Sequence, residues 1–175
     1  MRSRKLLIAL VLVLGLLATV AAADNMMAGP MVPLMRPWLV LLTATQQVPA
    51  GDSPAIGHAS FSLTADGMGL NFRVGVEGLV EGTAAHLHLG LPNENGPVVA
   101  NLFTGTMPEG YMDNMWPGNQ YYGNLAQGTI TAKDLVGPLQ GKPITCLLAL
   151  IHSDCAYVNV HTKAHPDGEI RGQVR

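Results

Sequence analysis

Apolar and polar residues alternate along much of the chain after residue 38, which is the pattern of β-strands with one buried face. The longest alternating stretch lies between residues 57 and 76, and Asp66-Gly67 supplies a hairpin turn within it. The apolar positions expected to face inward are Ala59, Phe61, Leu63, Leu70, Phe72, Val74 and Val76. This stretch therefore predicts a β-hairpin.

Further short segments with strand character lie along the rest of the chain, separated by turn residues. They are 38–48, 83–90, 98–103, 128–132, 157–161 and 169–174. The apolar segment 144–151 is either a short helix or a buried strand, because periodicity does not decide so short a run. Together these segments predict an all-β, single-domain antiparallel Greek-key β-sandwich or barrel with at most one short helix.

Residues 1–23 have the composition of a secretory signal peptide. Basic residues precede an apolar stretch at 6–17, and alanines at 21–23 precede Asp24. The apolar stretch is shorter than the roughly 20 residues of a spanning helix. We expect export to the periplasm, the cell surface or the medium, with no membrane span after cleavage; an uncleaved N-terminal anchor is the alternative.

Charge narrows the range of partners. Cleavage after residue 23 removes three of the 10 basic residues and none of the 12 acidic ones, which changes the formal net charge from −2 to −5. The remaining chain, of about 150 residues, is long enough for one domain with a single core. A mildly acidic domain without a basic stripe is a poor candidate for binding nucleic acid or anionic lipid.

The segment 24–37 forms a leader rich in methionine and proline. It contains Met26, Met27, Met31, Met35, Pro30, Pro33 and Pro37. The prolines argue against a helix or a central strand. The leader is either a flexible or edge-packed segment, or an arm that holds Cu(I), which thioether ligands favour.

The only two cysteines are Cys146 and Cys155. In an oxidising compartment this pair predicts a disulfide. A pair of thiolate metal ligands is the alternative, although the spacing matches no zinc motif.

An insert at 107–122 concentrates aromatic residues between two strands. They are Tyr111, Trp116, Tyr121 and Tyr122. Because tyrosine and tryptophan anchor protein interfaces, the insert is the best candidate for a surface that contacts a protein partner.

Histidine is rare, with six in 175 residues, but three of them fall on the polar faces of two predicted strands. His86 and His88 share one face of the segment 83–90, and His161 shares a face with Tyr157 and Asn159. Histidines at i and i+2 reach one metal ion, and a third from a neighbouring strand completes the set found in zinc and copper sites.

The metal hypothesis is therefore a Cu or Zn site formed by His86, His88 and His161, with His165 or His152 as a candidate fourth ligand. One alternative is a hydrogen-bonded network of these histidines and Asn159 inside the sheet, in which the ring N–H groups donate to carbonyls or carboxylates; another is surface histidines without a role. We also expect Arg171 to pair with a carboxylate.

Three sequence segments resemble the CHRD domain family, named after chordin. They are AAHLHLG at 84–90, NGPVVANL at 95–102 and AYVNVHTKAHPDGEIRGQV at 156–174. The resemblance begins near residue 41 and extends to the C-terminus; the insert and the two cysteines depart from the pattern. It implies an all-β extracellular domain at 38–175 with no well-defined general activity.

The H-x-H strand is also similar to the copper-binding strand of Cu,Zn superoxide dismutases. A dismutase needs a bridging histidine, further zinc ligands and a guiding arginine, and the sequence assigns none of these. Nor does it contain a nucleophile–base arrangement. We therefore favour non-catalytic metal binding, with copper preferred, over an extracellular interaction or adhesion module with structural histidines, and both over a dismutase-like enzyme.

Overall fold

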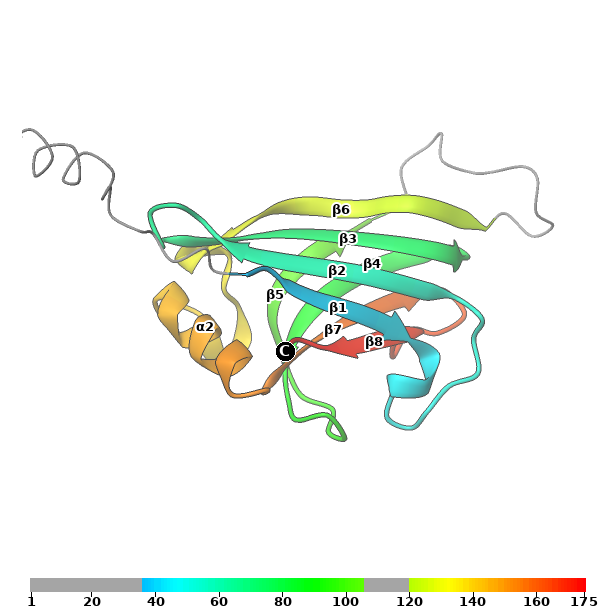
Figure 1. The fold of residues 1–175 in the computed structure, drawn as a ribbon. Helices are drawn as coiled ribbons and strands as arrows, with labels where there is room; N and C mark the ends of the chain where they lie inside the picture. Colours follow the sequence, from blue (N-terminus) through cyan, green and yellow to red (C-terminus); the bar gives the residue numbers. More distant parts are fainter. Residues whose placement is uncertain (1–35, 106–119) are drawn as a thin grey trace, which may run out of the picture. The chain divides into compact units, whose positions relative to one another are not determined.

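The computed structural model describes residues 36–105 and 120–175, in which eight strands pair into one antiparallel sheet (Figure 1). The strands are β1 (Trp38–Thr43), β2 (Ile56–Leu63), β3 (Gly69–Leu79), β4 (Gly82–Leu89), β5 (Val98–Thr104), β6 (Tyr121–Thr131), β7 (Ala156–Thr162) and β8 (Ile170–Gln173). Their order in the sheet is β5-β4-β7-β8-β1-β2-β3-β6. The edge strands β5 and β6 approach each other, so the sheet nearly closes into a barrel. The all-β fold predicted from the alternation is confirmed.

The predicted hairpin is formed by β2 and β3. Phe61 pairs with Phe72 and Ala59 with Val74. At the turn, the Asp66 carboxylate accepts hydrogen bonds from the Thr64 hydroxyl and the Met68 N–H. Gly67 adopts a φ of 70°, which glycine accepts without steric cost.

The core lies inside the curved sheet. The alternating residues of β3, β4 and β7 fill it, among them Val74, Leu87, Val158 and Val160, each with no exposed surface. Three helical turns of 3₁₀ type, Ala44–Gln46, Ala132–Asp134 and Gly137–Leu139, connect strands around it. The inner face thus takes an apolar set of side chains from the strands. The opposite face carries mostly polar side chains, except on β1, where Leu39 and Leu41 are exposed.

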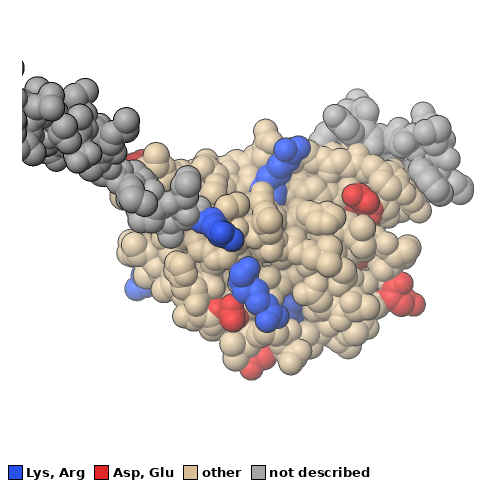
Figure 2. Space-filling model, viewed as in Figure 1, with Lys and Arg blue, Asp and Glu red and all other residues tan. Residues whose placement is uncertain are grey.

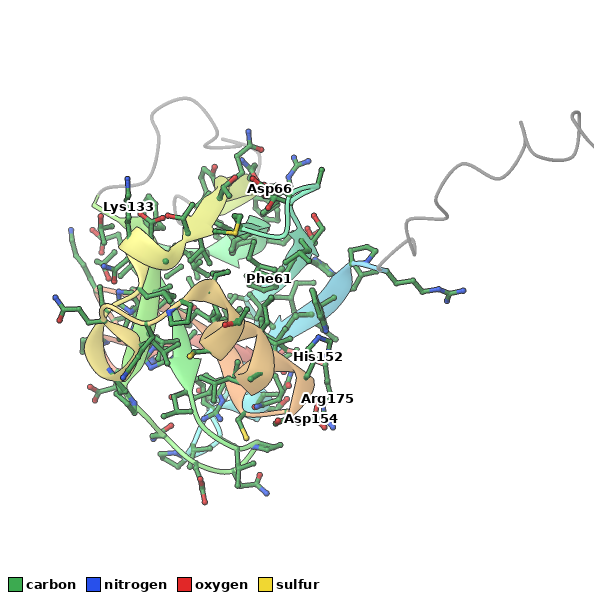
Figure 3. All side chains as sticks on the ribbon, turned by 90° about the vertical axis from the view of Figure 1, so that its left-hand side faces the viewer. Phe61, Asp66, Lys133, His152, Asp154 and Arg175 are labelled. Atoms are coloured by element: carbon green, nitrogen blue, oxygen red, sulfur yellow. The ribbon has the colours of Figure 1, made fainter. Side chains whose placement is uncertain are left out.

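The helix α2 (Ile144–His152) lies at one end of the sheet, the end that faces the viewer in Figure 3. It follows Pro143, whose fixed φ suits a helix start, and it buries Ile144, Leu147 and Ile151. These positions are spaced i, i+3 and i+7, so they form one helical face against the core. The apolar run at 144–151 is therefore the short helix rather than a strand.

The predicted disulfide is not present in the structure, where Cys146 and Cys155 are both free thiols. Cys146 lies in the first turn of α2 and Cys155 beyond its end. The Cys155 N–H donates to the Leu150 carbonyl at 2.8 Å, and its thiol donates to the Ser153 carbonyl at 3.2 Å.

Several predicted features fall on residues that the structure does not describe. The signal peptide, most of the leader, Tyr111 and Trp116 are outside the described residues. Of the other two insert aromatics, Tyr121 is buried in the core, with its hydroxyl donating to the Asn124 carbonyl. Tyr122 is partly buried and donates to the Gln120 side chain. None of the helices in the described residues is long and apolar enough to cross a bilayer.

Candidate metal centre

The candidate site lies on the outer face of β4 and β7, which are neighbours in the sheet. On the inner face, Leu87 and Val158 pair with each other and are fully buried. Because side chains alternate along a strand, His86 and His88 of β4 and His161 of β7 project from the opposite face. The fold thus brings together imidazoles that are as much as 75 residues apart in the sequence.

The three histidines converge on one small region. One nitrogen from each ring lies within 4.8 Å of the other two. His86 Nδ1 and His161 Nε2 are 3.2 Å apart. Two nitrogens bound to one tetrahedral ion at about 2.05 Å are roughly 3.3 Å apart, so this pair already has ligand spacing. The widest gap in the cluster, at most 4.8 Å, would need to shorten by roughly 1.5 Å to reach this spacing.

Backbone carbonyls fix the tautomers of two of the rings. His88 Nδ1 lies 2.9 Å from the Gly96 carbonyl oxygen, and His161 Nδ1 lies 2.9 Å from that of Pro166. A carbonyl only accepts hydrogen bonds, so each Nδ1 carries the hydrogen and each neutral ring keeps a lone pair on Nε2. Metal-binding histidines almost always donate their other ring N–H in this way.

The two Nε2 lone pairs have different surroundings. His161 Nε2 accepts the hydrogen of His86 Nδ1. His88 Nε2 is buried and, within the described residues, has no hydrogen-bond partner. A buried acceptor without a partner costs about 1–3 kcal/mol, so native proteins rarely leave one unused. A cation bound between the rings would satisfy it.

Burial also holds the three rings in their neutral form. It lowers the pKa of His86 to about 4, with smaller contributions from the neighbouring His161 and His88. It lowers the pKa of His88 and of His161 as well, against the opposing effect of the hydrogen bonds to Gly96 and Pro166. Neutral imidazole is the form that binds metal. In the metal-free protein His86 Nδ1 carries the hydrogen that it donates to His161, so metal binding at pH 7 requires His86 to move this hydrogen to its Nε2.

The sequence model of the CHRD domain matches residues 39–174. The chain belongs to the CHRD domain family. No curated protein and no solved structure matches it. The family assignment confirms the resemblance in the strands that carry the histidines, and CHRD domains are typically extracellular modules.

Arg171 has a different environment in this CHRD domain from the one expected. It is 1% exposed and donates to the carbonyl oxygens of Leu91 and Glu94, both at 2.9 Å, and to Asn95 Oδ1 at 3.1 Å. Its guanidinium also lies 3.5 Å from the centroid of the Tyr157 ring. The predicted carboxylate partner is wrong, because the loop before β5 supplies neutral oxygens instead.

The other candidate ligands do not join the cluster. His165 is exposed in the turn between β7 and β8, and its backbone pairs with Thr162. His152 ends α2, where its ring contacts Trp38 with centroids 5.4 Å apart (Figure 3). The cluster found in the described residues comprises His86, His88 and His161.

The alternative of a hydrogen-bonded histidine network is only partly realised. His86 and His161 bond to each other, but Asn159, the neighbour of His86 on β7, lies against Gln47 and the Asp167 carbonyl. His88 joins the network through its Nδ1–H, which donates to the Gly96 carbonyl as that of His161 donates to Pro166. Only His88 Nε2 stays without a partner among the described residues.

Sequence reasoning missed the groups that orient His88. The Tyr157 ring stacks on the His88 imidazole, with centroids 4.8 Å apart and planes 11° apart. The Gly96 carbonyl comes from a loop that no periodicity describes. The one available signal was the shared strand register of Tyr157 and His88, which required knowing that β4 and β7 pair.

Proposed function

We propose that this protein is an exported CHRD domain that binds one transition-metal ion through His86, His88 and His161. The observation that carries the proposal is the buried lone pair of His88 Nε2, which has no partner among the described residues, on a ring that clusters with those of His86 and His161. Three neutral imidazoles around one point are a metal-binding donor set.

Copper is the favoured ion. Imidazole suits zinc, copper, iron and nickel, and divalent copper binds most tightly to a given nitrogen site in the first-row series. The methionines of the leader at 24–37 add thioether groups that favour Cu(I). Zinc is the alternative, since it also takes three histidines and one open position.

The proposed role is storage, delivery or stabilisation rather than catalysis. Within the described part of the chain, the three histidines are the one group of metal-ligating side chains. A dismutase-like site would need a second metal with a carboxylate ligand. Together with the signal-peptide pattern at 1–23, the family's typical setting supports a role outside the cytoplasm, in the periplasm, at the cell surface or in the medium.

Metal content of the purified protein tests this proposal. The protein is prepared without a histidine tag or chelators, incubated with copper or zinc, and analysed by mass spectrometry. We expect close to one ion per chain, lost in a His86→Ala/His88→Ala variant. A matched control with His58→Ala and His152→Ala removes two histidines outside the cluster and should keep the ion. An ion that is equally bound by both double variants would place the site elsewhere.

An interaction module is the second candidate, and exposed leucines favour it. Leu39 is 72% and Leu41 53% exposed on the outer face of β1. They line a shallow hollow with His58, Ser60 and Arg73. The side of the molecule viewed in Figure 2 is mostly uncharged, with basic residues near its middle. If this face binds a protein, Leu41→Glu should abolish binding of that protein in a pull-down from extracellular fluid without changing metal content.

A further inference from the structure

The neighbours of His88 form a stack that spans three strands. Tyr157 belongs to β7, which lies between β4 and β8 in the sheet. From β4, the His88 imidazole stacks on the Tyr157 ring with centroids 4.8 Å apart. From β8, the Arg171 guanidinium lies 3.5 Å from the centroid of the same ring. The aromatic ring therefore links a cluster histidine to a buried cation.

The 90–97 loop covers this stack, and Arg171 is its main anchor. The Arg171 guanidinium donates three hydrogen bonds to loop oxygens, those of Leu91, Glu94 and Asn95. The loop is also tied to the sheet by Gln173, whose side-chain amide donates to the Gly90 carbonyl at 2.9 Å. These hydrogen bonds fix the position of the 90–97 loop relative to the sheet.

Gly96 lies at the point where the loop contacts the site. Its N–H donates to the Tyr157 hydroxyl at 3.0 Å, and its carbonyl oxygen is 2.9 Å from His88 Nδ1. A Cβ at this position would lie 1.8 Å from the Leu89 carbonyl oxygen, so only glycine permits the close approach. The carbonyl that sets the His88 tautomer is therefore placed by contacts to both Tyr157 and the anchored loop.

We propose that Arg171 and Tyr157 are positioning residues of the metal site. Arg171 anchors the 90–97 loop and Tyr157 holds Gly96, so that the Gly96 carbonyl keeps the hydrogen of His88 on Nδ1 and leaves Nε2 free for the ion. This inference rests on the proposed metal binding, and it assigns Arg171 and Tyr157 as residues that set the affinity for the metal ion.

The choice of arginine supports this role. A buried cation is costly unless it is well hydrogen-bonded, and an apolar side chain would fill the same space without that cost. What arginine adds is a planar fork that reaches several carbonyls at once, which lysine does not reproduce. Because its acceptors are loop oxygens, the benefit of Arg171 lies in placing the loop.

Two variants and one control test the proposal. Arg171→Lys keeps the charge and removes the fork, and Tyr157→Phe keeps the ring and removes the hydroxyl. Arg73→Lys is the matched control, since Arg73 is exposed on β3 and bonds to Asn124. The first readout is the His88 tautomer from histidine ¹⁵N chemical shifts of the metal-free protein, and the second is the dissociation constant for Cu(II).

We expect the parent and Arg73→Lys to show His88 with hydrogen on Nδ1. Arg171→Lys and Tyr157→Phe should show a mixture with the Nε2–H form and should bind copper about 10–100-fold more weakly, as is usual when the partner of a ligating histidine is lost. If Arg171→Lys does not fold, the nearly isosteric Tyr157→Phe variant alone tests the proposal.

An unchanged His88 tautomer in the folded variants would overturn the proposal, whether or not the affinity falls. A parent that binds no metal would instead contradict the proposed function, while the tautomer measurement would still decide the role of Arg171 and Tyr157.

Discussion

Replacement of His88 by leucine separates a metal site from a structural histidine. The variant removes the buried Nε2 acceptor, which costs about 1–3 kcal/mol if it stays without a partner. It also removes the hydrogen bond from Nδ1 to Gly96, worth about 1 kcal/mol. The Gly96 carbonyl keeps a contact to the Tyr157 hydroxyl at 3.4 Å, so it is not left alone. We therefore expect metal-free His88→Leu to be within about 1 kcal/mol of the parent, or more stable.

With metal bound, the parent should be more stable than His88→Leu. An ion at 100 times its dissociation constant stabilises the folded state by about 2.7 kcal/mol. For a domain of this size that corresponds to an increase in Tm of about 10 °C. His88→Leu should gain much less, because one of the three ligands is gone.

The assay is thermal and urea unfolding followed by circular dichroism, with a chelator and with added copper. A metal-free variant that is less stable than the parent by more than about 3 kcal/mol would show that His88 is a structural residue. The same conclusion would follow if copper left the Tm of the parent unchanged.

Two further predictions concern stability. Because burial lowers the pKa of His86 to about 4 and lowers those of His88 and His161, the unfolded chain binds more protons than the folded one. The metal-free protein should therefore keep its stability above about pH 6.5 and lose stability as the pH falls toward 4. Urea unfolding midpoints measured across this range test the prediction. A midpoint that rises on acidification would contradict it. Leu147→Ala, which empties a fully buried position of α2, should cost about 2–5 kcal/mol in urea unfolding without changing metal content, and a cost below 1 kcal/mol would argue against α2 packing on the core.

Alternation was enough to predict which side chains share a face. Val158 and Val160 face the core and His161 faces out, as the period of two requires. What alternation does not encode is which strands pair. The 3.2 Å contact between His86 and His161 depends on β4 lying beside β7, although the two residues are 75 positions apart in the sequence.

The remaining parts of the site come from segments without periodicity. The carbonyls of Gly96 and Pro166 belong to loops, and a backbone acceptor leaves no mark in the sequence. Arg171 was expected to meet a carboxylate, and no sequence pattern indicated the loop carbonyl oxygens that it contacts instead. The sequence did not decide whether the short apolar run of α2 is a helix or a strand. The structure decides it, because the residues at i, i+3 and i+7 pack on the core as one helical face.

X-ray absorption at the copper edge of the loaded protein tests the central claim most directly, because it counts the imidazoles around the ion. We predict three imidazole nitrogens at about 2.0–2.1 Å in the parent and two in His161→Ala. A spectrum of the parent with no more than one imidazole, or one that His161→Ala leaves unchanged, would contradict the assignment of His86, His88 and His161 as a metal centre.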